Sequence, residues 1–243
     1  LQLDVGPHTV AVQAHSGYNW DDGTAISSAV ITVVAPVAGA STWQGVQQSA
    51  TAPSWGQAVS ISGTLRDATG TALSGAPVRV QSSSNGVSFA DVSGATVTNL
   101  PSGVYLTSVT PLQRTYYRLA FAGSGVVAGS SSSVAVVVPQ VSLSTPSAKS
   151  TSSHKVKLKV SGTLRPSHRS SSRTVKLRIE RWNGHRWVGY GSVWTRVTRH
   201  NSSYSTYSAK IRLRSGRFRL HADAPADSLH ALTHSGYKTV TVK

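Results

Sequence analysis

The 243-residue sequence predicts an all-β protein built from tandem copies of one folding unit of about 100 residues. Three short segments recur in the same order at steps of 98 to 101 residues: Ser62-Gly63-Thr64-Leu65-Arg66 as Ser161-Gly162-Thr163-Leu164-Arg165, Asn85-Gly86 as Asn183-Gly184, and Tyr117-Arg118-Leu119-Ala120 as Phe218-Arg219-Leu220-His221. Because the order is kept and the steps nearly agree, residues 37–139 and 140–243 are predicted to be two copies of the unit.

The composition also favours strands over helices. Charged residues make up only 13% of the chain, whereas Ser, Thr, Val, Ala and Gly are abundant. β-Branched side chains suit the pleated surface of a sheet, and Gly and Ser suit turns. No apolar run approaches the ~20 residues that a membrane helix requires. Cysteine is absent, which excludes disulfides and thiolate chemistry.

Alternating polar and apolar residues mark the individual strands. Val156, Leu158 and Val160 are predicted to face one way, with lysines between them facing the other. Expected strands in the two units are 42–49, 58–65, 78–80, 102–109, 116–121, 133–138, 155–160, 175–180, 210–214, 217–221 and 237–242. Roughly seven short strands per ~100 residues, with frequent turn signals, are typical of an immunoglobulin-like β-sandwich.

Residues 1–36 are predicted to be the C-terminal part of one more such unit. Alternation over 8–14 and an apolar run over 29–34 indicate two strands, and Pro36 ends the pairing. The fold class is therefore all-β, with tandem immunoglobulin-like β-sandwiches of which the first is incomplete. The chain is expected to be the C-terminal portion of a longer protein.

Several segments resemble the bacterial immunoglobulin-like repeat domains of large cell-surface and secreted proteins. The resemblance is carried in the second unit by Ser62-Gly63-Thr64-Leu65, Gly103-Val104-Tyr105, Thr115-Tyr116-Tyr117-Arg118 and Phe121-Ala122-Gly123. The third unit is similar to C-terminal, actinobacteria-like versions through Trp182-Asn183-Gly184, Tyr204-Ser205-Thr206-Tyr207, Ala224-Pro225-Ala226-Asp227-Ser228 and His234-Ser235-Gly236-Tyr237. The resemblance implies stalks, spacers and adhesive modules at the cell surface, but it assigns no ligand.

The net charge of +16 is concentrated in the third unit. Residues 1–139 hold four Arg against five Asp, which gives −1. Residues 140–243 hold the other 20 Lys and Arg against three acids, which gives +17. An acidic partner is therefore expected to meet the third unit.

Six cations are predicted to share one outer sheet face of that unit: Lys155, Lys157, Lys159, Lys210, Arg212 and Arg214. Such a face would attract an anionic cell-wall polysaccharide or another polyanion. The alternative is a solvated face whose lysines keep the protein soluble and block edge-to-edge pairing. No nucleic-acid reader module is visible, so specific nucleic-acid binding is not expected.

The Asn183-Gly184 hairpin supplies a second candidate site. A two-residue turn there would place Trp182 opposite His185, Glu180 opposite Trp187 and Arg178 opposite Gly189. Arg178, Trp182, His185 and Trp187 would then lie outward together, where aromatic rings could stack on sugars. The alternative is that the tryptophans merely cover the sheet. For Trp194, a position in the core and one on the surface both stay open.

Metal and catalytic chemistry are not predicted. His221, Asp223, Asp227, His230 and His234 are suitable ligand types, but their spacing is not diagnostic. We expect no metal site and no cofactor. Only eight acids are present, and no nucleophile elbow, metalloprotease motif or phosphate loop occurs.

The sequence thus predicts a non-enzymatic extracellular protein. Its first two units would be spacers, and its basic third unit would dock on an anionic cell-envelope polymer. Two alternatives stay open: a structural subunit of a surface layer or filament, packing against copies of itself, and a glycan-binding module accessory to an upstream enzyme.

Overall fold

The computed structural model of the chain describes residues 6–13, 26–33 and 38–243, apart from 150–154, 170–172 and 200. Every named element in these ranges is a β-strand. No helix in the described part of the chain is long and apolar enough to cross a membrane. The first fragment contributes an antiparallel hairpin of β1 (Gly6–Gln13) and β2 (Ile26–Val33), at the two places where strands were predicted.

The second unit consists of two sheets. One has the order β3-β4-β8-β7, formed by β3 (Ser41–Gln48), β4 (Val59–Asp67), β8 (Val104–Val109) and β7 (Val97–Asn99). The other has the order β10-β9-β5-β6, formed by β10 (Val127–Ser131), β9 (Thr115–Ser124), β5 (Val78–Ser83) and β6 (Ala90–Asp91), and β11 (Ala135–Val137) also pairs with β9.

The third unit has the same arrangement. One sheet has the order β12-β13-β17-β16, formed by β12 (Ser142–Leu143), β13 (Lys155–Arg165), β17 (Ser205–Arg214) and β16 (Arg196–Arg199). The other has the order β15-β14-β18-β19, formed by β15 (Trp187–Trp194), β14 (Lys176–Trp182), β18 (Gly216–Ala224) and β19 (Thr233–His234), and β20 (Lys238–Val242) also pairs with β18. Both units are therefore immunoglobulin-like β-sandwiches, as the sequence predicted.

The core of the third unit follows the predicted alternation. Leu158 and Val160 of β13 and Ile211 and Leu213 of β17 point inward, and each is at most 7% exposed. They pack against the opposite sheet through Leu177, Ile179, Phe218 and Leu220. Since alternate residues of a strand face opposite sides, this inward row fixes which residues of β13 and β17 face solvent.

The repeated pentapeptide lies in equivalent strands, β4 and β13, and its glycine faces a buried tyrosine. Gly63 pairs with Tyr105, and Gly162 pairs with Tyr207. The Tyr207 ring is fully buried, and its hydroxyl donates to the Ser144 carbonyl at 2.7 Å. Burial raises the pKa of Tyr207 to about 12. A Cβ at Gly162 would overlap this ring, so Gly162 makes room for the tyrosine, whereas a Cβ at Gly63 would meet Val46, Trp43 and Leu119 instead.

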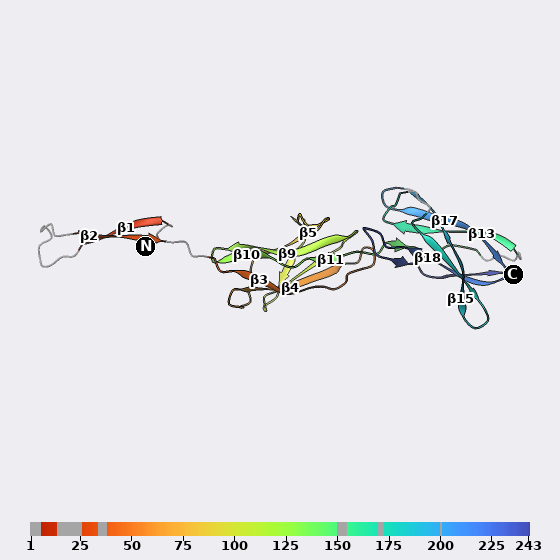
Figure 1. Ribbon diagram of the computed structural model, residues 1–243, viewed down its shortest axis with the longest axis horizontal. Coiled ribbons are helices and arrows are strands. Elements are labelled where there is room, and N and C mark those ends of the chain that lie inside the picture. The colour runs from red at the N-terminus through yellow and green to blue at the C-terminus, as the bar shows by residue number, and fades with distance from the viewer. Residues whose placement is uncertain (1–5, 14–25, 34–37, 150–154, 170–172, 200) are drawn as a thin grey trace.

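The second and third units meet end to end through loops (Figure 1). The backbone N–H of Arg114 donates to the Leu229 carbonyl at 2.7 Å, and Arg114 Nε donates to the Ser228 carbonyl at 2.8 Å. The Ala231 N–H donates to the Pro139 carbonyl at 3.0 Å. The loop between β18 and β19 is therefore part of the junction between the two units.

Candidate functional site

The basic face is the outer surface of β13 and β17, and its cations lie directly opposite one another. The pairs in the register are Lys155 with Arg214, Lys157 with Arg212, and Lys159 with Lys210. The pairing of β13 with β17 thus places these six residues side by side. The five side chains from Lys157 onward are exposed, whereas the side chain of Lys155 lies outside the described part of the structure.

No acid of the third unit compensates these charges. The unit has only three acidic residues. Glu180 and Asp223 belong to β14 and β18 of the other sheet, and Asp227 lies in the loop at the junction of the units. Like charges directly across an antiparallel pair are destabilising. The basic face therefore carries repulsion that no acidic residue of this unit offsets.

The same face of the second unit is uncharged where the third unit has cations. When Gly63 is aligned with Gly162, and Tyr105 with Tyr207, Ser60 corresponds to Lys159 and Ser108 corresponds to Lys210. Ser60 and Ser108 pair with each other across β4 and β8. The fold thus forms without this charge, which separates the cations from the structural requirements of the sandwich.

The basic face continues into an open groove that the sequence did not reveal. The groove has a volume of about 490 Å³ and is lined by Lys159, Val193, Trp194, Arg196, Ser208, Ala209 and Lys210. Arg196 pairs with Ser208 and therefore shares the outer face with Lys210. Trp194 is 41% exposed at the end of β15. The groove places one aromatic ring and one further cation beside the predicted lysines.

The predicted register of the Asn183 hairpin is wrong. The structure pairs Trp182 with Trp187, Glu180 with Gly189 and Arg178 with Ser192, and the register shifts between Ile179 and Glu180. The turn spans four residues because Asn183 Oδ1 accepts hydrogen bonds from the backbone N–H groups of His185 (3.0 Å) and Arg186 (2.9 Å). A side-chain cap of this kind stabilises a wider turn than the two-residue loop.

The corrected register keeps only part of the predicted aromatic site together. Trp182 and Trp187 pack edge to face with their ring centroids 5.3 Å apart. His185 lies exposed in the turn, away from the sheet. Arg178 shares the outer face, but its Nε donates to Asp223 Oδ2 at 2.8 Å. The four residues thus do not form one open platform.

Trp187 is also covered by cations. Arg217 and Arg219 lie over its ring at 5.6 and 5.1 Å, and Arg219 forms an ion pair with Glu180. The second unit has a matching arrangement, in which Arg118 lies 4.2 Å over the Phe89 ring and donates to Gln81 Oε1. An arrangement present in both units favours a structural role for Trp187.

Asp223 lines an open pocket of about 490 Å³ on the same sheet. Its carboxylate contacts Arg178 Nε at 2.8 Å, His234 Nδ1 at 2.8 Å and His221 Nε2 at 3.3 Å. Burial alone would raise the pKa of Asp223, but the hydrogen bonds from His234 and Arg178 hold it below its ordinary value of 3.8. Burial lowers the pKa of His221 below its ordinary value of 6.5.

These two shifts predict that acid destabilises the third unit. Below pH 6.5 the unfolded chain protonates His221, which the folded chain protonates only at lower pH, so stability present above pH 6.5 falls as the pH drops. Asp223 acts with the same sign below pH 3.8. Thermal unfolding of the chain between pH 7.5 and 5 measures the first effect. His221→Gln should flatten this dependence, and an unchanged slope in that variant would contradict the assignment.

No family model and no curated protein matches the chain. Among solved structures it is similar to one of titin, at 8% identity and a TM-score of 0.33, over 84% of this chain and 98% of that chain. It is also similar to FdeC, an Escherichia coli adhesin, at 14% identity and a TM-score of 0.36, over 90% of this chain and 68% of that chain. Likenesses this weak carry no argument about ligand or activity, and the actinobacteria-like resemblance of the third unit stays a prediction.

Proposed function

We propose that the basic face of the third unit docks the chain on an anionic polymer of the cell envelope. The chain would be a non-enzymatic extracellular protein, with its first two units as spacers. The observation that carries the proposal is the set of three like-charge pairs across β13 and β17, which no acid of the unit offsets.

An anionic polymer would relieve the repulsion that the fold leaves in place. Each like-charge pair is expected to destabilise the sheet by roughly 0.2–1 kcal/mol. Residues on one face repeat every ~6.6 Å along a strand, so three cation pairs line a path of about 13 Å. A polymer laid along this path would contact both rows of cations at once. Trp194 at the edge of the path is 41% exposed, and Lys176 Nζ lies 5.4 Å from its ring centroid, so only the exposed part of the ring would be open to a sugar.

Cosedimentation of the full chain with insoluble polyuronate or wall teichoic acid tests the proposal, with neutral dextran as the reference polymer. We expect binding to the anionic polymers at low salt and a steep loss towards about 1 M salt, where the Debye length falls to ~3 Å. Lys157→Gln/Lys210→Gln/Arg212→Gln should lower the affinity at least tenfold by removing half of the six cations.

A matched control removes the same charge elsewhere. Arg186→Gln/Lys238→Gln/Lys243→Gln changes three exposed cations, none of which belongs to β13, β16 or β17. This variant should bind almost as well as the parent chain. Equal losses in the two triple variants would contradict docking through the basic face. Self-assembly of the chain at physiological salt without polymer would instead favour a structural subunit.

Nucleic acid provides a second control, because any polyanion can bind a basic face through its phosphates. We expect random-sequence DNA to compete with the polyuronate through charge alone. A strong preference for one DNA sequence over others of equal length would contradict the proposal. The interface would then have to read base edges, which requires side chains placed in a groove.

A further inference from the structure

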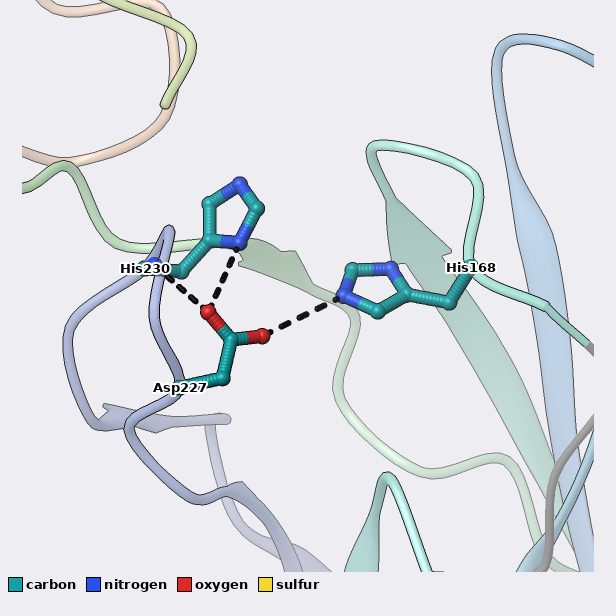
Figure 2. Close-up of side chains that lie close together, drawn as sticks. All are labelled: His168, Asp227 and His230. Atoms are coloured by element: carbon teal, nitrogen blue, oxygen red, sulfur yellow. Dashed lines mark hydrogen bonds and ion pairs between the residues drawn. The ribbon is translucent and has the colours of Figure 1, made fainter. Parts of the chain in front are cut away.

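Three ionisable side chains converge at the junction of the second and third units (Figure 2). His168 follows β13, whereas Asp227 and His230 lie in the loop between β18 and β19. His168 Nε2 is 3.9 Å from Asp227 Oδ2, and His230 Nδ1 is 3.4 Å from Asp227 Oδ1. One atom from each residue can be chosen so that all three lie within 4.8 Å of one another.

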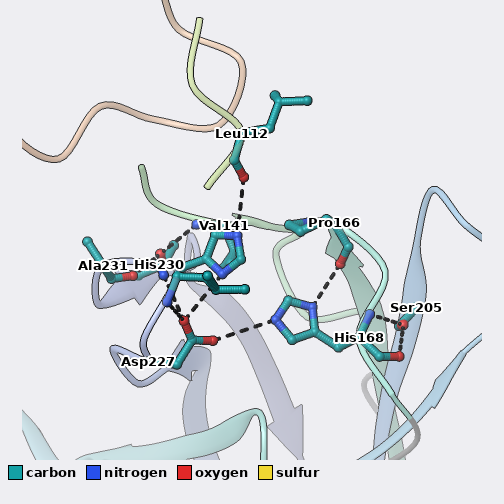
Figure 3. Close-up of polar contacts among 10 residues, drawn as sticks. Leu112, Val141, Pro166, His168, Ser205, Asp227, His230 and Ala231 are labelled. Carbon is teal, nitrogen blue, oxygen red and sulfur yellow. Dashed lines mark hydrogen bonds and ion pairs between the residues drawn. The ribbon is translucent and has the colours of Figure 1, made fainter. Parts of the chain in front are cut away.

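The surrounding backbone determines which nitrogen of His168 faces the carboxylate. His168 Nδ1 lies 2.8 Å from the Pro166 carbonyl oxygen, which can only accept a hydrogen bond (Figure 3). Nδ1 therefore carries the proton in the neutral ring, and the Nε2 lone pair points towards Asp227. The backbone N–H of His168 also donates to Ser205 Oγ at 2.9 Å, which fixes the position of the residue.

His230 is held in the same manner with its nitrogens exchanged. His230 Nε2 lies 3.3 Å from the Leu112 carbonyl of the second unit, so Nε2 carries the proton (Figure 3). The lone pair of Nδ1 then faces Asp227. His230 is only 4% exposed, and its Nδ1 makes no hydrogen bond. A buried nitrogen lone pair beside a carboxylate oxygen is unfavourable unless a cation lies between them.

We propose that His168, Asp227 and His230 form a binding site for a divalent transition-metal ion of the zinc class. Two imidazole nitrogens and one carboxylate are a ligand set that Zn²⁺ accepts, with bonds of about 2.0–2.2 Å. Tetrahedral geometry with such bonds places ligand atoms about 3.4 Å apart, so atoms that now lie within 4.8 Å of one another would move closer by at most about 1.4 Å. The carbonyl groups that bind the other ring nitrogens are the usual second partners of metal-bound histidines.

The fourth ligand position has room for water. A pocket of about 230 Å³ borders the cluster, and its wall includes His168 and Asp227 together with Val141, Arg173, Thr174 and Pro225. Three protein ligands and one position open to solvent form a complete tetrahedral set. The bound ion would join the segment after β13 to the β18–β19 loop and fix the ring that contacts Leu112. It would therefore stiffen the junction between the two units.

The other His and Asp cluster of the third unit is a weaker candidate. His221, Asp223 and His234 also bring ligand atoms within 4.8 Å of one another. However, Arg178 Nε lies 2.8 Å from the Asp223 carboxylate, so the guanidinium charge would repel a metal ion bound to that carboxylate. Within the described part of the chain, the Asp227 carboxylate contacts the two histidines, and Arg173 lies in the wall of the adjoining pocket. The charge environment thus favours the junction site.

Titration of the chelator-treated full chain with ZnCl₂, followed by calorimetry, tests the site, and CoCl₂ provides a visible spectrum that reports tetrahedral coordination. We expect one strong site per chain, with tetrahedral Co²⁺ bands. Asp227→Asn and His168→Gln should each weaken binding at least tenfold and abolish those bands. Asp227→Asn keeps the Oδ1 atom that accepts from the N–H groups of Leu229 and His230, so the loop should stay folded.

His234→Gln is the matched control, because it removes a ligand from the other cluster, and it should bind zinc as the parent does. Zinc should also slow amide hydrogen exchange around Leu112 and Leu229 in the parent chain and in His234→Gln, but not in Asp227→Asn. Absence of zinc binding to the parent chain overturns the proposal. Binding that survives Asp227→Asn and His168→Gln, or is lost in His234→Gln, overturns it as well.

Discussion

Gly162→Ala is expected to destabilise the third unit by about 3 kcal/mol, the upper part of the usual range for overpacking a core. The new methyl group would overlap the Tyr207 ring and hydroxyl. Tyr207 cannot move away easily, because it is fully buried and its hydroxyl donates to the Ser144 carbonyl. Differential scanning calorimetry of the full chain should show a lower melting temperature for the third unit and an unchanged transition for the second.

Gly191→Ala is the matched control for this substitution. Gly191 also lies in a strand of the third unit, but a Cβ there would meet no atom within 4 Å. Its effect should stay within about 0.5 kcal/mol. Gly162→Ala combined with Tyr207→Leu should cost less than the sum of the two single changes, because the smaller side chain removes the overlap. Strict additivity, or equal effects of the two glycine variants, would contradict the explanation.

The strands were predictable because their signal is local. Alternation over β4, β13 and β17 follows from the period of two, and each inward residue belongs to a core that the same alternation defines. The 99-residue step between the pentapeptides indicated the copies without any knowledge of packing. The reason for Gly162 was not predictable, since Tyr207 reaches it from a strand 45 residues later.

The hairpin shows where local reasoning fails. Asn183-Gly184 is a common two-residue turn, and the sequence offers no sign that the Asn183 side chain caps a four-residue loop instead. The register shift between Ile179 and Glu180 depends on the pairing of β14 with β15 and is equally hidden. The four-residue turn shifts the pairing by two residues, so His185 lies in the turn and Trp187 takes the predicted place of His185 opposite Trp182.

The candidate sites also differ in whether a local sequence pattern could predict them. The six cations of the basic face were predictable because β13 and β17 are neighbours in any immunoglobulin-like sandwich. Trp194 and Arg196 were missed because the chain passes from one sheet to the other between β15 and β16. The junction cluster was missed because His168 and Asp227 are 59 residues apart. Ligand spacing within a single loop cannot reveal such a pair.

Lys157→Glu is expected to change polymer binding and stability in opposite directions. Lys157 lies directly opposite Arg212, so the substitution replaces a repulsive cross-strand pair with an attractive one. The free energy of unfolding of the third unit should rise by about 0.5–1 kcal/mol. Affinity for the anionic polymer should fall roughly tenfold at low salt, because a negative charge would stand in the middle of the cation rows.

Urea unfolding and cosedimentation of the same protein preparation measure the two effects. Lys238→Glu introduces the same charge change at an exposed position of β20, opposite Leu220, and should leave both quantities nearly unchanged. If the cations only keep the protein soluble, Lys157→Glu will stabilise the unit without weakening polymer binding more than the control does. If the cations instead stabilise the sheet, Lys157→Glu will lower the free energy of unfolding. Only a docking surface predicts that Lys157→Glu makes the third unit more stable and also weakens its binding to the anionic polymer. The reason is that the like charges then oppose folding and at the same time bind the polymer.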